Sequence, residues 1–149
     1  MADFDRTQSI KRLTGDGFDR VNFDPELIGY SGPSIACGVI FVHAFWAGSS
    51  VKTLKSFCDS LVRVDTERRL RFVVCDIDSF AEPVPWLYQG DSSGGNGDLF
   101  WIHNGLIVAR LTANRSCDFD TTNRSLLELC DADRTRPAEA LILQALNKG

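Results

Sequence analysis

Residues 38–50 have the sequence GVIFVHAFWAGSS, which gives the clearest indication of the fold. Its first eight residues form an apolar run that only His43 interrupts, and its abundance of Val, Ile and Phe is typical of a β-strand buried on both faces of an α/β sheet. Ser49 or Ser50 can cap a helix directly after it. Apolar residues then recur at helical spacing from Val51 to Val62. The stretch therefore predicts a central strand that leads into a helix.

Two further segments extend this unit. LRFVVCD, residues 70–76, is another strand of the buried type, and strand, helix and strand with short connections predict a right-handed parallel crossover. Apolar segments at residues 99–102 and 106–109 flank His103-Asn104-Gly105, and Asn-Gly is a strong hairpin signal. Together these elements predict an α/β fold with a central mixed sheet of four to five strands flanked by helices.

The remaining segments are assigned more coarsely. Residues 1–16 are polar, and we expect an N-terminal arm or short helix there, followed by one domain over residues 17–149. A short strand and a short helix beginning at Asp24-Pro25 are expected between residues 16 and 32. The other expected elements are a loop over residues 79–97 with at most one helical turn near 85–88, and two helices over about 122–130 and 137–146.

Composition and charge narrow the classes of partner. The chain has 149 residues, the length of one domain, and a formal net charge of −4, which argues against nucleic acid as a partner. The Arg63 to Arg71 cluster contains Asp65 and Glu67, which favours a solvated helix end over a phosphate-binding patch. The longest apolar run, Val39 to Ala47, is too short to cross a bilayer. We therefore expect a cytoplasmic protein without a membrane segment.

Five cysteines are spread along the chain at positions 37, 58, 75, 117 and 130. Their number is odd, their spacings are wide and no two form a C-x-x-C, which favours free thiols in a reducing compartment over a disulfide framework. Cys58, Cys75 and Cys130 fit buried apolar faces, whereas Cys117 is the most open to solvent. Paired zinc ligands are absent from the sequence. We expect neither a metal nor another cofactor.

The order of these elements resembles that of the thioredoxin family, and three motifs support the likeness. WAGSS at residues 46–50 follows an apolar strand in the manner of the family's W-C-G-P-C. Asp76-Ile77-Asp78 ends the second strand in an acidic pair, and FWIHNGLIV at residues 100–108 is similar to the hairpin sequence LLFKNGKVV. The likeness covers roughly residues 35–110 and, more loosely, the last helix. It implies a thioredoxin-like fold.

The sequence departs from the family at its functional positions. The two motif cysteines fall at Ala47 and Ser50, neither of which can form a thiolate or a disulfide. The buried acid of the family falls at Phe41, its lysine neighbour at Val74, and the cis-proline that shapes the substrate groove at Gly97. Apolar replacements fit a site that has lost its chemistry, because a buried polar pair without a task lowers stability. The departures imply a redox-inactive member of the family.

Such a protein would work by binding a protein partner, as an accessory, adaptor or immunity-type protein. Ser50 lacks an evident base, because His43 lies back in the strand and fits a core or sheet-face position, and a serine without a base is a weak nucleophile. We expect the groove of the family to serve as the recognition surface. The residues expected to contact the partner are Trp46, Gly48, Ser49, Ser50, Trp86, Asn96, Gly97 and Asp98.

Several alternatives remain open. The chain could be an enzyme, an atypical thiol oxidoreductase that uses Cys37 or Cys117, or it could be a structural subunit of a larger complex. Trp46 and Trp86 could pack under a loop instead of contacting a partner. Gly94 to Asp98 is rich in glycine, but it precedes a strand and not a helix, so it does not fit a phosphate-binding loop.

Overall fold

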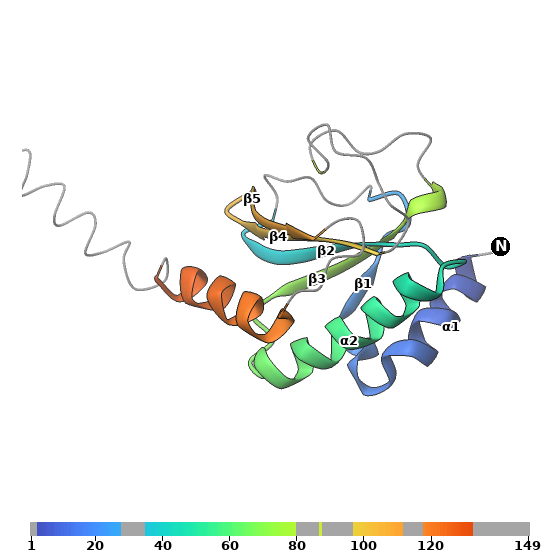
Figure 1. Ribbon diagram of the computed structural model, residues 1–149, viewed down its shortest axis with the longest axis horizontal. Helices are drawn as coiled ribbons and strands as arrows, with labels where there is room; N and C mark the ends of the chain where they lie inside the picture. Colours follow the sequence, from blue (N-terminus) through green and yellow to red (C-terminus); the bar gives the residue numbers. More distant parts are fainter. Residues whose placement is uncertain (1–2, 28–34, 80–86, 88–96, 112–117, 133–149) are drawn as a thin grey trace, which may run out of the picture.

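The computed structural model in Figure 1 describes residues 3–27, 35–79, 87, 97–111 and 118–132. Its elements are α1 (Asp3–Thr14), the 3-10 helix η1 (Gly15–Arg20), β1 (Val21–Phe23), β2 (Cys37–His43), α2 (Gly48–Val64), β3 (Arg71–Asp76), the 3-10 helix η3 (Ile77–Ser79), β4 (Asp98–His103) and β5 (Leu106–Leu111). A further helix covers residues 119–132.

The five strands form one sheet in the order β1-β3-β2-β4-β5. β1, β3 and β2 run parallel, whereas β4 is antiparallel to β2 and β5 is antiparallel to β4. Because α2 connects β2 to the parallel strand β3, the predicted parallel arrangement of strand, helix and strand is confirmed. The predicted hairpin is confirmed as well, and Asn104 and Gly105 at its tip have positive φ angles of 50° and 78°. The mixed α/β architecture is the one that the sequence predicts.

Both faces of the sheet are buried, which explains the continuous apolar sequence of β2. In Figure 1, α1, α2 and the helix over residues 119–132 lie on the same side of the sheet. This side buries Val39, Phe41, Phe72, Leu99 and Trp101 against Ile10, Leu54, Phe57, Leu61 and Leu126. The opposite side buries Ile40, Val42, Val73, Cys75, Phe100 and Ile102 with Leu27, Ile35 and Leu87. Consecutive residues of β2 thus enter two different clusters.

The ends of the chain differ in part from the prediction. Residues 3–14 form α1, and its Ile10 is fully buried. The helix predicted from Asp24-Pro25 is wrong for the described residues, because Leu27 donates its N–H to the Asp24 carbonyl at 3.1 Å and closes a turn at a φ of 56°. The expected helix over 137–146 and the expected helical turn near 85–88, apart from Leu87, lie outside the described residues.

One buried carboxylate, that of Asp65, fixes the end of α2. Its side chain accepts hydrogen bonds from the backbone N–H groups of Arg69 and Leu70, each at 2.8 Å, and forms an ion pair with Arg20. Arg20 also donates to the carbonyl of Leu61 at 2.9 Å. Asp65 therefore links η1, the last turn of α2 and the start of β3.

Removing this carboxylate should be costly. In Asp65→Ala, the Arg20 guanidinium stays buried without a counter-ion, so we expect the free energy of unfolding to fall by about 3–5 kcal/mol in urea denaturation. The matched control is Asp19→Ala, which removes the exposed ion pair with Arg68 and should cost less than about 1 kcal/mol. Similar losses in the two variants would contradict the assigned role of Asp65.

Candidate functional site

The turn between β2 and α2 carries a large exposed apolar side chain, that of Trp46. Its relative exposure is 68%. Ala47 donates its N–H to the carbonyl of Ala44 and accepts the N–H of Val51, both at 3.1 Å, so the turn is closed by backbone bonds on either side of Trp46. Gly48 begins α2 and is exposed. The turn therefore presents an indole to solvent on a fixed backbone.

Gly97 packs directly on the first turn of α2. It is buried, with a φ of 87°, and a Cβ atom added to it would lie 2.8 Å from Cζ of Phe41 and 3.2 Å from Cα of Ser50. A side chain at this position would therefore meet both a core ring and the backbone of α2. Glycine allows this close backbone approach because it has no side chain. The contact also brings together two of the segments predicted to form one surface.

His43 and Ser50 form a buried polar pair beside this contact. The Ser50 hydroxyl lies 2.7 Å from Nδ1 of His43 and accepts the N–H of Ala44 at 3.0 Å. Both side chains are fully buried. The expectation that no base stands next to Ser50 is therefore wrong. The turn folds α2 back over the end of β2, so residues seven apart in the sequence meet, and the one signal for this was a histidine in an apolar strand.

The environment of His43 keeps its imidazole neutral. Burial lowers the pKa of His43 to about 4, and the ring lies between those of Phe41 and Phe45, with centroids 5.6 and 4.4 Å away. The Ser50 oxygen accepts the N–H of Ala44, and its hydroxyl shares one further hydrogen bond with Nδ1 of the neutral ring. Nε2 is buried and has no hydrogen-bond partner among the described residues. The pair thus has the composition of a nucleophile and base, but in the described part of the chain no carboxylate bonds to the ring nitrogen opposite the serine, as one does in a catalytic triad.

The predicted contact residues divide into exposed and buried ones. Trp46 and Gly48 are exposed and Ser49 is half-buried, whereas Ser50, Gly97 and Asp98 are buried. The buried members shape the surface from below and do not offer their side chains to a partner. Trp86 and Asn96 lie outside the described residues.

A disulfide joins Cys37, at the start of β2, to Cys130 in the helix over residues 119–132. The prediction of free thiols is wrong for this pair, because the fold brings two positions 93 residues apart to a Cα separation of 6.4 Å. No local spacing signals such a pairing. Cys58 and Cys75 are free and buried, as predicted. Burial raises the pKa of Cys58 to about 11 and raises that of Cys75 as well. Cys117 lies outside the described residues.

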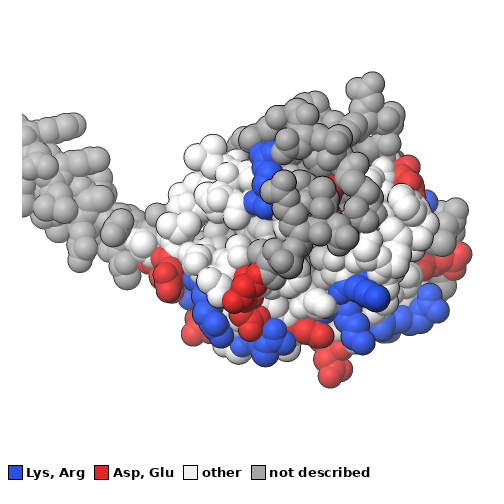
Figure 2. Space-filling model, in the orientation of Figure 1, with Lys and Arg blue, Asp and Glu red and all other residues white. Residues whose placement is uncertain are grey.

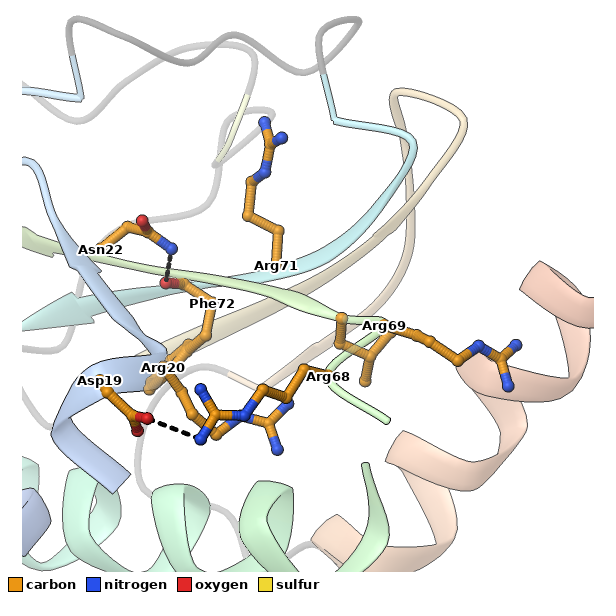
Figure 3. A pocket seen from close by; sticks show the side chains of 8 residues that line it. Asp19, Arg20, Asn22, Arg68, Arg69, Arg71 and Phe72 are labelled. Carbon is orange, nitrogen blue, oxygen red and sulfur yellow. Dashed lines mark hydrogen bonds and ion pairs between the residues drawn. The ribbon is translucent and has the colours of Figure 1, made fainter. Parts of the chain in front are cut away.

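A hollow of about 330 Å³ beside β1 and β3, shown in Figure 3, is lined by Arg20 and by three arginines of the Arg63 to Arg71 cluster, Arg68, Arg69 and Arg71. Arg68 pairs with Asp19, Arg20 with Asp65, and Arg69 with Asp131. Figure 3 shows that Arg71 points away from Arg68 and that Arg69 points toward the helix over residues 119–132. The guanidinium groups do not converge on one point, so the hollow lacks the geometry of a phosphate clamp.

On the face shown in Figure 2, the surface charges are also of both signs. Figure 2 shows basic and acidic side chains interspersed along the side that carries α1 and α2. Arg63 on α2, for example, forms an exposed ion pair with Asp120 at 2.8 Å. Such mixed charge is typical of a solvated surface and offers no stripe for a polyanion.

Comparison with known proteins identifies no family: no protein-family model matches the chain, and no curated protein matches it. Within the described residues, no group of three or more His, Cys, Asp or Glu side chains is placed to hold a metal ion. The described helices include none that is long and apolar enough to span a membrane.

The close contact at Gly97 generates a test with a matched control. In Gly97→Ala, the added methyl group meets Phe41 and the α2 backbone at a positive φ, so we expect a loss of about 3 kcal/mol in the free energy of unfolding. Gly48→Ala adds a methyl group at a position with nothing within 4 Å, and it should be neutral or stabilising by up to about 1 kcal/mol. An unchanged free energy of unfolding in Gly97→Ala would contradict the contact with α2.

The lowered pKa of His43 makes stability depend on pH. Between pH 6.5 and 4 the unfolded chain binds a proton at His43 that the folded chain does not, so stability falls as the pH falls through this window. From pH 7 to 4.5, this group should cost about 2.5 kcal/mol. In urea denaturation, the free energy of unfolding of His43→Gln should fall less between pH 7 and 4.5 than that of the parent protein, by this amount. If the free energy of unfolding changed equally with pH in the parent protein and in His43→Gln, the folded chain would bind a proton at His43 as readily as the unfolded chain. That result would contradict the lowered pKa.

Proposed function

We propose that this chain is a thioredoxin-like domain that has lost dithiol chemistry and binds a protein partner through the surface around Trp46. The order of elements supports the proposal, because β2 leads into α2 at the WAGSS turn, α2 crosses over to the parallel strand β3, and the β4–β5 hairpin follows. The contact of Gly97 with Ser50 supports it further. It matches the relation between the motif and the groove-shaping proline that the resemblance implies.

The exposed indole of Trp46 is the observation that carries the binding function. A tryptophan at 68% exposure leaves a large apolar surface in water, and tryptophan is the residue type most enriched among residues that dominate binding energy. The backbone beneath it is fixed by the hydrogen bonds of Ala47 and by the packing of Gly97 on α2. A rigid aromatic anchor loses little conformational entropy on binding, which favours its use in recognition.

The chemistry around the anchor supports binding over catalysis. Ala47 and Ser50 stand where the two reactive cysteines of the family would be, and Ser50 is fully buried. Phe41, at the position of the buried acid of the family, is paired in register with Val74, at the position of the lysine. Neither side chain can transfer a proton. The hydroxyl of Ser50 and the ring of His43 bond to each other inside the core and have no exposed surface for a substrate to reach.

One observation favours the enzymatic alternative. Cys37 and Cys130 are joined by a disulfide and are both partly exposed, so a thiol could reach them. An atypical oxidoreductase would use this pair, and it would reduce insulin disulfides in the presence of a dithiol. Activity above a no-protein control that is lost in Cys37→Ser would favour this alternative. The proposed binding function requires no activity.

Site-specific crosslinking tests the binding surface. We place a photo-crosslinking phenylalanine derivative at position 46 and, as a control, at Val62, which is 46% exposed on α2 and about 20 Å along the helix from its start. In native lysate, one specific protein should crosslink to the chain from position 46. That protein should not crosslink from position 62. Affinity for that partner should then fall by about 2 kcal/mol in Trp46→Ala, with the melting temperature unchanged.

Two outcomes would contradict the proposal. Equal crosslinking from positions 46 and 62 would place the contact elsewhere or show that it is not specific. A loss of melting temperature in Trp46→Ala that accounts for the loss of affinity would show that the indole supports the fold and does not contact the partner.

A further inference from the structure

The helix over residues 119–132 is held by two separate sets of contacts. At its beginning, Asp118 accepts the backbone N–H of Thr121 at 3.2 Å and its hydroxyl at 2.8 Å, which caps the helix. Asp120 accepts the Ser60 hydroxyl of α2 at 2.6 Å. Trp101 of β4 donates its indole N–H to Asn123 at 2.8 Å. This first half is therefore fixed by polar contacts to both α2 and the sheet.

The second half of the helix is held differently. After the buried pair Leu126 and Leu127, the contacts of this half include the packing of Cys130 against the core, its disulfide to β2 and the ion pair of Asp131 with Arg69, which also donates to the carbonyl of Leu127 at 3.4 Å. An ion pair with an exposed partner contributes little. The disulfide is the covalent attachment of this last turn to β2.

The disulfide is also placed to react. Cys37 and Cys130 are both partly exposed, whereas Cys58 and Cys75 are buried. Burial raises the pKa of both free thiols, so neither forms the thiolate that thiol–disulfide exchange requires. Within the described residues, exchange chemistry is therefore confined to the Cys37–Cys130 pair.

We propose that the Cys37–Cys130 disulfide is a reversible redox switch that docks or releases the last turns of this helix. The reductant is a dithiol, or two molecules of a monothiol such as glutathione. Its thiolate attacks one sulfur of the pair, forms a mixed disulfide and releases the other cysteine as a thiolate. A second thiolate of the reductant then displaces the first cysteine. The protein pair gains two electrons and two protons, and the reductant leaves as its disulfide.

Reduction should change the helix without unfolding the domain. The first half keeps its contacts to Ser60 and Trp101, and the two disulfide cysteines pack against the core cluster from its edge, where both are partly exposed. The second half keeps Leu126 and Leu127 but loses its covalent link to β2. Cys37 begins β2, whereas the Trp46 turn follows the other end of that strand. The switch is therefore separate from the proposed binding surface and does not depend on it.

Two measurements on the full chain test the switch, in a Cys117→Ser background that removes the remaining cysteine. The protein is equilibrated in glutathione buffers of graded redox ratio, alkylated and mapped by mass spectrometry. Cys37 and Cys130 should become alkylated together as one two-electron couple, while Cys58 and Cys75 stay protected. Hydrogen exchange of amides 126–132 should then rise about tenfold or more on reduction, with amides 119–123 and β2 unchanged.

Matched variants separate the switch from a general loss of stability. Cys130→Ser and Cys37→Ser should each show fast exchange at residues 126–132 in every buffer, and Cys58→Ser should respond to reduction like the parent. Three outcomes would overturn the proposal. The first is a hydrogen-exchange rate at residues 126–132 that does not change with the redox ratio. The second is an increase in the exchange rate over the whole sheet. The third is separate glutathionylation of Cys37 and Cys130 in place of their joint oxidation to a disulfide.

Discussion

The buried ion pair of Asp65 and Arg20 is the interaction on which the parallel half of the fold depends. After α2 ends, the chain must turn so that β3 lies beside β2. The backbone N–H groups of this turn need hydrogen-bond acceptors, because the chain enters the core there. The Asp65 carboxylate accepts two of them and holds a cation from η1 at the same time. A buried charge is tolerated when it is paired and fully hydrogen-bonded. This one sets the distance between α2 and the first strands.

The pairing of β2 with β3 connects the Asp65 end of α2 with the packing at its other end. Once β3 is fixed against β2, Phe41 lies beside Val74, and its ring reaches the position under Gly97. Gly97 can then approach the first turn of α2 because it has no side chain. The exposed Trp46 sits on a turn that is held from below by this contact. The geometry of the candidate surface thus follows from packing that begins at the other end of α2.

The sequence predicts the parts of this arrangement that have a local pattern. The apolar run of β2, the periodic face of α2 and the Asn104-Gly105 turn each occupy a short window, and each appears in the structure. Asp65 gave no such signal, because it lies in a run of charged residues that is typical of a solvated helix end, yet it is 1% exposed.

The candidate site was predicted only in part for a related reason. The close approach of Gly97 follows from the residue type, whereas the pairing of His43 with Ser50 depends on how the turn folds α2 back over β2. The Cys37–Cys130 disulfide depends on the path of 93 residues. Contacts between distant segments leave no periodicity in the sequence, so composition and spacing predict them poorly.

The distribution of buried charge bears on what the region near Trp46 can do. Asp76, at the end of β3, is buried and forms an ion pair with Arg6 of α1, as Asp65 does with Arg20. His43 lies beside Asp76 in the register of β2 and β3, and its lowered pKa keeps it uncharged. A base whose pKa is far below neutrality is a poor proton acceptor in its surroundings. The polar side chains of His43, Ser50 and Asp76 near the Trp46 turn are thus buried in the protein, whereas the Trp46 indole faces solvent. A binding surface requires this division of roles, because a partner can reach only the exposed side chain.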